Sequence, residues 1–270
     1  MRSTLLALPL LLIPLTSCTK EADVPLAEKA EKLEVEKPAD AGVATYTIQG
    51  ADAKVGFSMD APFEKIRGKV PGAAIGGTIY ADLDDLAKST ALIHVDLSAL
   101  ELFQQAKGDD GEFGEEKKED LQNEHARAWL EISPDTPEDV RKKNERVEFS
   151  IKSVTNASTP AIAKMDGATR SVTFTATGEF LLHQRKAEKS AEIEATFHFE
   201  GDKPTKLTVK TVKPLLVGLD EYDVRPREGF GKLAAKALAD LAPKVAKEAA
   251  IELEFTAALD ESGGADAKSP

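Results

Sequence analysis

The stretch SVTFTATGEFLL, residues 171–182, decides the fold class, because polar and apolar residues alternate along it with a period of two. Successive side chains of a β-strand point to opposite faces of a sheet, so the pattern predicts a long strand with one solvated and one packed face. Gly178 lies inside the pattern and predicts a bend, since a glycine within a strand often marks a bulge.

The same alternation recurs on both sides of this stretch, from residue 44 to residue 259. With little predicted helix and short turns such as residues 201–204, it indicates an all-β fold, an antiparallel sandwich or barrel. In each of these stretches, the residues at every second position are apolar, and we expect them to face inward. These residues are Val55, Phe57, Met59, Ile93, Val95, Val147, Phe149, Ile151, Val172, Phe174, Phe180, Ile193, Phe197, Phe199, Leu207, Val209, Ile251, Leu253 and Phe255.

Two segments interrupt the strands. Gly231 to Lys247 is alanine-rich with apolar residues at four-residue spacing, which predicts an amphipathic helix, kinked at Pro243, before the last strand. Lys107 to Asp120 combines acidic residues with three glycines and predicts a mobile, solvated loop. A calcium site is the alternative there, although the spacing does not match the EF-hand pattern.

The N-terminus has the pattern of a secretory signal. A basic start at Arg2 precedes an apolar stretch, Leu5 to Leu15, that is too short to span a bilayer. Leu15-Thr16-Ser17-Cys18 follows and resembles the bacterial lipobox, in which the cysteine is lipidated and becomes the new N-terminus. An ordinary signal peptide that happens to contain a cysteine is the alternative. By resemblance to Gram-negative sorting, Thr19 rather than aspartate favours the outer membrane.

These features predict four regions. Residues 1–17 form the signal peptide, 18–43 the lipidated cysteine and a flexible charged tether, 44–259 the barrel, and 260–270 a disordered tail. The tether holds alternating charge and few apolar residues, so it cannot bury enough surface to offset its ordering entropy. A short helix over residues 27–36 is the only structure expected in it.

Several function classes are disfavoured by composition. A formal net charge of -12 opposes binding to nucleic acid. One cysteine allows no intramolecular disulfide and no thiolate metal cluster. The four histidines, His94, His125, His183 and His198, are far apart, and no nucleophile elbow is present. We therefore predict no enzyme, no catalytic residue, no metal and no cofactor.

The sequence also resembles the YceI-like family over about Tyr46 to Leu259. The resemblance rests on the order and spacing of several segments, among them AKVGFSM at 53–59, ALIHVDL at 91–97, VEFSIKSV at 147–154, TGEFLLH at 177–183 and PLLVGLDEYDV at 214–224. It implies an antiparallel lipocalin-like barrel of about eight strands that holds a polyisoprenoid chain. The family's turn after the Leu-His region is replaced here by Gln184-Arg185-Lys186.

The expected function is the non-enzymatic binding or carriage of an apolar, elongated lipid, an isoprenoid or isoprenoid quinone. The carrier would be a periplasmic lipoprotein, held at the outer membrane by Cys18. The alternative is a structural or partner-binding envelope lipoprotein whose barrel is filled by its own side chains. A third class, the integral outer-membrane barrel, should show aromatic girdles, and aromatic residues here total 6%. The sequence does not identify a protein partner.

The cluster at Asp220 to Asp223 has two interpretations that the sequence leaves open. It is either a salt-bridged turn at the rim of the barrel or a polar gate that meets a ligand headgroup.

Overall fold

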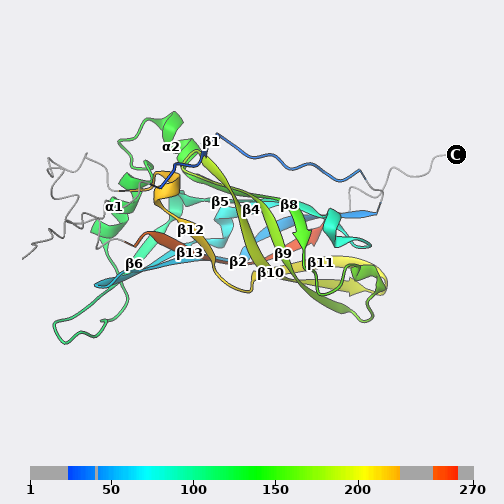
Figure 1. The fold of residues 1–270 in the computed structure, drawn as a ribbon. Coiled ribbons are helices and arrows are strands. Elements are labelled where there is room, and N and C mark those ends of the chain that lie inside the picture. Colours follow the sequence, from blue (N-terminus) through cyan, green and yellow to red (C-terminus); the bar gives the residue numbers. More distant parts are fainter. Residues whose placement is uncertain (1–23, 40–41, 226–245, 261–270) are drawn as a thin grey trace, which may run out of the picture.

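The computed structural model describes residues 24–39, 42–225 and 246–260 (Figure 1). Eight antiparallel strands close into a barrel, in which each strand pairs with the next barrel strand along the chain and the last pairs with the first. The all-β prediction is therefore confirmed. The barrel strands are β2 (Val43–Asp60), β4 (Ile75–Asp82), β5 (Thr90–Asp96), β8 (Arg146–Thr155), β9 (Thr169–Leu182), β10 (Arg185–Glu200), β11 (Lys203–Thr211) and β13 (Glu248–Leu259).

Barrel strands β2 and β13 are long enough to change partners along their length. Residues 43–47 of β2 pair with β4, and residues 55–60 pair with β3 (Glu64–Val70). The first half of β13 pairs with β12 (Leu215–Gly218), and its second half pairs with β11. Two further strands, β6 (Glu101–Ala106) and β7 (Lys117–Lys118), extend the sheet beyond β3. The sheet is thus a closed ring at one end and broadens at the other.

We call the end at which the sheet is a closed ring the hairpin end, and the end at which it broadens the helix end (Figure 1). The hairpin end carries the β4–β5, β8–β9 and β10–β11 connections, with short 3-10 turns η2 (Leu86–Lys88) and η4 (Ile162–Lys164). The helix end carries α1 (Asp120–Trp129), α2 (Glu138–Asn144), η5 (Asp220–Tyr222) and the β9–β10 turn. The remaining 3-10 turns are η1 (Gly72–Ala74) and η3 (Leu97–Ala99).

The bend predicted at Gly178 is a close approach of two backbones. A Cβ at this position would lie 1.9 Å from the carbonyl oxygen of Ser150 on β8. The β8–β9 register also shifts between Ile151 and Ser153, directly opposite. The sequence places glycine here because no side chain fits between the strands.

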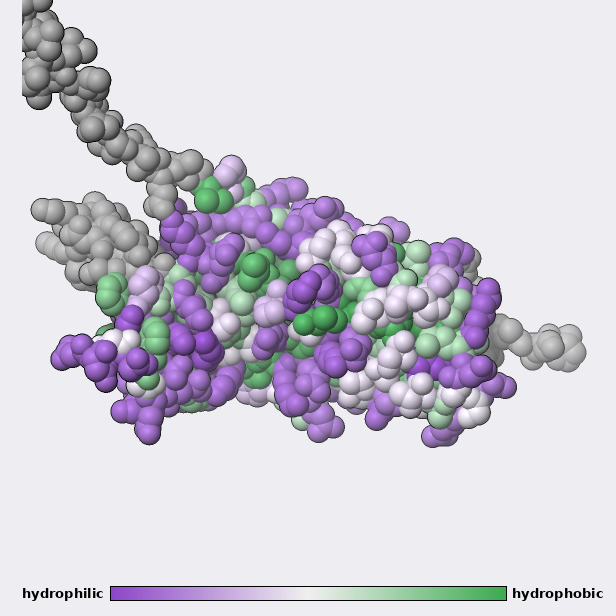
Figure 2. Space-filling model, turned by 60° about the horizontal axis from the view of Figure 1, so that its bottom comes forward, coloured by the Kyte–Doolittle hydropathy of each residue, from purple (hydrophilic) through white to green (hydrophobic). Residues whose placement is uncertain are grey.

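The outer surface of the barrel is charged. Glu194 of β10 pairs with Lys210 of β11 at 2.9 Å, and Glu192 of β10 pairs with Lys213, after β11, at 2.7 Å. Figure 2 shows one face on which hydrophilic side chains predominate and apolar ones show in small areas between them. A surface of paired charges is the reverse of the apolar belt that an integral outer-membrane barrel presents to lipid. Within the described ranges, no helix is long and apolar enough to cross a bilayer.

The tether prediction is wrong for residues 24–39, which lie along the outside of the barrel. Glu28 and Lys29 form the short strand β1 (Glu28–Lys29), which pairs with the first residues of β10. Leu33 is 6% exposed, and its N–H donates to the carboxylate of Glu148 at 2.5 Å. The backbone groups of this segment form hydrogen bonds with the barrel, and these bonds order it. The prediction considered only its low apolar content and therefore missed them. The expected helix over residues 27–36 is absent from the described chain.

The acidic segment also differs from the predicted loop. It returns to the sheet through a bridge between Lys107 and Phe113 and through β7, and α1 begins at Asp120. The ammonium groups of Lys65 and Lys107 lie over the Phe113 ring, 4.4 and 5.7 Å from its centroid. The described residues contain no group of acidic, histidine or cysteine side chains that could hold a metal, so the calcium alternative gains no support. The helix predicted over 231–247 falls mainly on residues outside the described ranges, as do the signal peptide, Cys18 and the tail after residue 260.

Candidate ligand cavity

The barrel encloses an apolar cavity of about 230 Å³. Its lining on β10 runs from Ala191 to Phe197, and at ~3.3 Å per residue this corresponds to roughly 20 Å along the strand. An apolar cavity of about 150 Å³ is enough to stay dry and bind benzene. The cavity is therefore elongated and large enough for an apolar guest.

All the inward residues predicted from the sequence line this cavity except Val172 and Phe199. Those two are buried at the hairpin end, beyond the end of the cavity. Alternation correctly assigned them to the inner face, but it carries no information on height along the barrel axis. Whether the lining residues bind a ligand remains a prediction.

The residues that the sequence analysis did not assign to the lining lie both at the helix end and elsewhere along the wall. Ala126, Trp129 and Leu130 reach the cavity from α1, at the i, i+3, i+4 spacing of one helix face. Leu215 and Val217 of β12 show a period of two that was readable in the sequence. The other missed residues are Gly56, Val70, Ile79, Ala81, Leu86, Ser89, Ala91, Leu97, Leu100, Leu102, Glu148, Val154, Leu182, Ala191, Ala195, Thr211, Leu219, Val224 and Ala249.

Ser89, Thr211 and Glu148 at the cavity wall form hydrogen bonds within the protein. The hydroxyl of Ser89 accepts from the N–H of Asp82 at 3.0 Å, and that of Thr211 accepts from the N–H of Leu253 at 3.2 Å. The Glu148 carboxylate accepts from the Leu33 N–H and from Arg146. Among the described residues, the wall therefore presents almost entirely apolar surface to a guest.

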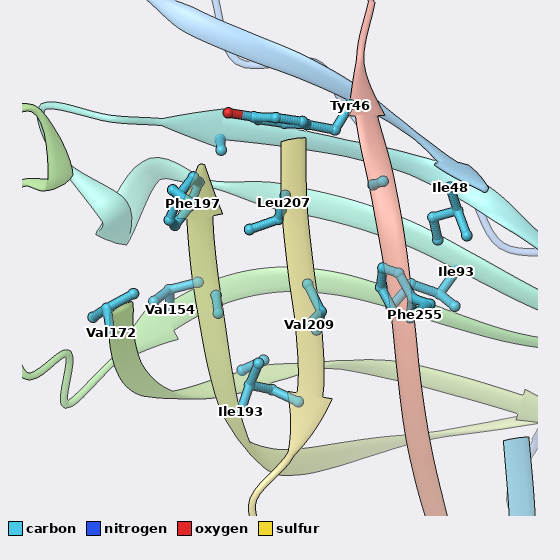
Figure 3. Close-up of a cluster of buried hydrophobic side chains, with 14 of the residues drawn as sticks. Tyr46, Ile48, Ile93, Val154, Val172, Ile193, Phe197, Leu207, Val209 and Phe255 are labelled. Atoms are coloured by element: carbon cyan, nitrogen blue, oxygen red, sulfur yellow. The ribbon is translucent and has the colours of Figure 1, made fainter. Parts of the chain in front are cut away.

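A packed plug closes the hairpin end. Ile162 and Tyr46 are fully buried there, and the Tyr46 and Phe197 rings meet edge to face with centroids 6.2 Å apart (Figure 3). The Arg170 guanidinium lies 3.8 Å from the centroid of the Phe199 ring and donates to the carbonyl oxygens of Ile162 and Gly167. Burial raises the pKa of the Tyr46 phenol well above its usual value, so this group is neutral at physiological pH.

The helix end is closed by turns and by a buried cluster of its own, which includes Leu102, Val217 and Tyr222. Tyr222 is buried against Phe180, with ring centroids 5.7 Å apart, and burial raises the pKa of its phenol. His183, in the tight β9–β10 turn, bonds to the Tyr222 carbonyl oxygen at 3.0 Å and to the Glu131 carboxylate at 2.8 Å. These contacts fasten η5 and the end of α1 to the barrel. Half-buried Trp129 and Leu219 line the cavity beside them.

The Asp220–Asp223 cluster has the geometry of a salt-bridged turn. Glu221 pairs with Lys189 at 2.6 Å, and Asp223 pairs with Arg225 at 2.8 Å. None of its four residues lines the cavity as the structure describes it. The polar-gate hypothesis therefore gains no support.

The histidines lie apart in the structure, as they do in the sequence. His94 lies on the outer face of β5 with a lowered pKa, chiefly because of burial and also because of the nearby Arg146 charge. His198 also has a lowered pKa through burial. His125 stacks on Trp129, with ring centroids 6.4 Å apart. None of them lines the cavity.

Fold and cavity together define a class: an up-and-down antiparallel barrel with an apolar interior cavity. No protein-family model matches the chain, and no curated protein matches it. Among solved structures, it is similar to a polyisoprenoid-binding domain from Saccharophagus degradans, with 12% sequence identity and a TM-score of 0.47. The similarity covers 81% of this chain and 99% of that domain.

Proposed function

We propose that the barrel binds and carries an elongated, apolar lipid of the isoprenoid class, without catalysing a reaction. The observation that carries this proposal is the cavity wall, which is almost entirely apolar and whose Ser89, Thr211 and Glu148 side chains accept hydrogen bonds from within the protein. A guest gains from this wall by removing apolar surface from water, at roughly 25 cal/mol for each Å². A polar or charged guest would lose its hydration without compensation.

The isoprenoid class follows from the shape of the cavity and from the sequence resemblance to the YceI-like family. The lining mixes aliphatic residues with phenylalanines, such as Phe57, Phe149 and Phe174, along roughly 20 Å of strand. A branched hydrocarbon chain can fill such a wall without needing a polar partner. An isoprenoid quinone fits if its ring stays at the end of the chain, outside the apolar lining.

The carrier is proposed to be a lipoprotein at the periplasmic side of the outer membrane. This part rests on Leu15-Thr16-Ser17-Cys18 and Thr19, which lie outside the described residues. Several acyl chains on one cysteine, as in lipobox proteins, give the stable anchoring that a single chain does not. Cys18→Ser should release the protein from membranes, and fractionation of cells would show this. Unchanged membrane partition of the variant would contradict the lipobox.

Organic extraction of the purified protein, followed by mass spectrometry, tests the carrier directly. A prenyl lipid in the extract is the expected result. Val55→Phe should exclude it, because this side chain lines the cavity and the added ring occupies the space of the guest. Lys54→Phe is the matched control: the neighbouring side chain points outward, where it forms only an exposed ion pair with Glu254.

The milder variant Phe174→Leu should weaken retention of a fluorescent isoprenoid while the circular dichroism spectrum stays unchanged. Phe174 lines the cavity and is only half-buried, so its loss removes contact with the guest more than contact with the protein. If wild-type protein yields no lipid and binds no fluorescent isoprenoid, the carrier is refuted and a structural or partner-binding lipoprotein is left.

A further inference from the structure

The segment over residues 24–39, the docked segment, runs along the barrel from the helix end to the hairpin end. At the helix end, the Ala27 N–H donates to the Glu221 carbonyl oxygen at 2.9 Å, and the Ala30 N–H donates to that of Gln184 at 3.0 Å. Near the hairpin end, the Thr90 hydroxyl donates to the Glu36 carbonyl oxygen at 2.8 Å. The first described residues of the segment therefore lie at the helix end (Figure 1).

The docked segment is held along its whole length. Lys143 of α2 pairs with Glu31 at 2.7 Å. The Ser150 hydroxyl donates to the Glu34 carbonyl oxygen at 2.6 Å. Between them, Leu33 is buried over Glu148, whose side chain is 1% exposed. Lifting the segment would break the hydrogen bond between the Leu33 N–H and Glu148 and expose the Leu33 side chain to water, and both changes oppose release.

This docking shortens the chain between anchor and barrel. Cys18 and Val24 are six residues apart, and an extended chain spans at most ~3.3–3.6 Å per residue, or roughly 20 Å. The barrel is longer than that, because the 16 residues of β10 extend over roughly 50 Å. A lipid on Cys18 can therefore reach a bilayer near the helix end, but not one facing the hairpin end.

We infer that the docked segment orients the anchored barrel, with the helix end of its cavity toward the bilayer that holds the lipidated cysteine. The inference rests on the proposed lipid anchor and names the partner surface of the same cavity. The cavity wall reaches half-buried Trp129 and Leu219 at this end, whereas the plug around Ile162 closes the other. A guest thus exchanges with the bilayer through the helix end without crossing open water.

Exposed apolar side chains agree with this orientation. Val24, Leu26, Phe63 and Leu121 are large, exposed and at the helix end, and no such side chain is found on the hairpin-end connections in the part of the chain that is described. The acidic segment lies at the helix end too, and it would repel anionic headgroups. The bilayer that suits this end is therefore zwitterionic.

Energy transfer from the lipidated protein to a headgroup-labelled lipid in phosphatidylcholine vesicles tests the orientation. Glu124→Cys on α1 and Asp202→Cys in the β10–β11 turn each place one dye on an exposed acidic position, at opposite ends. Cys18 is the only natural cysteine and bears no free thiol once it is lipidated, so each variant is labelled once. Transfer from position 124 should exceed transfer from position 202.

Leu33→Asp provides the matched release variant, because it sets a carboxylate against the buried carboxylate of Glu148. The difference between the two positions should disappear in this background, while vesicle flotation and isoprenoid retention persist. Equal transfer from both positions in the parent protein, or greater transfer from position 202, overturns the inference. Failure to float with vesicles refutes the anchor and the orientation together. Absence of a bound isoprenoid, with the transfer difference intact, refutes only the carrier.

Discussion

The two ends of the barrel are built from the same alternating strands but are filled differently. At the hairpin end, Tyr46, Ile162 and Val172 are almost completely buried and pack as a plug. Toward the helix end, Phe57, Met59 and Ile251 line the cavity and stay half-buried. The comparison teaches that inward residues of the same pattern either pack closely, as in the plug, or border the cavity, and close packing stabilises whereas a cavity does not.

The largest expected effect comes from comparing two isoleucines, Ile162 in the plug and Ile251 at the cavity. Ile162→Ala in the plug should lower the free energy of unfolding by about 2–5 kcal/mol, because it removes fully packed methyl groups and leaves a cavity. Ile251→Ala should cost roughly 1 kcal/mol, since its side chain already borders empty space, while it weakens isoprenoid retention. Urea unfolding and lipid retention would be measured on both. Equal losses of stability would contradict the division into plug and cavity.

The plug also depends on a buried cation. Arg170→Met should cost about 1–3 kcal/mol in urea unfolding, because the carbonyl oxygens of Ile162 and Gly167 lose their donor in a buried site. Arg170→Lys keeps a cation over Phe199 and should recover part of the loss. Isoprenoid retention should not change in either variant, since Arg170 does not line the cavity. A loss of retention with unchanged stability would place the guest in the plug.

Sequence patterning predicted the fold class and the part of the cavity wall that the barrel strands with the clearest alternation supply, because alternation directly reports which strand face is packed. It could not place the plug, since Val172 and Phe199 alternate in the same way as Phe174 and Phe197. Height along the barrel depends on register, and register emerges only from pairing between strands distant in sequence. The docked segment was missed for a related reason: its partners, such as Glu148, lie more than a hundred residues away.

The docked segment runs between the two ends, and a substitution beneath it should have a smaller effect on stability. Glu148→Gln should cost about 1 kcal/mol of stability, because the amide keeps an acceptor for the Leu33 N–H but loses the charge that attracts Arg146. The main result should be faster proteolysis within residues 24–39, since the segment opens more often. Limited proteolysis with mass spectrometry measures this. Unchanged cleavage would mean that the segment is held by its backbone pairing alone.

The smallest effect concerns the pH dependence of the same region. His94 faces Glu148 across the β5–β8 pairing, and burial, with the charge of Arg146, lowers the pKa of its imidazole below the ordinary value of about 6.5. The unfolded chain then binds the proton more readily than the folded one, so stability falls as the pH drops through about 6.5 toward the lower folded-state pKa. His94→Gln should remove this part of the slope, measured by urea unfolding on both sides of that pH. An unchanged slope, or a His94 resonance that titrates above the ordinary value in NMR, would show that the imidazolium is stabilised beside Glu148 rather than disfavoured.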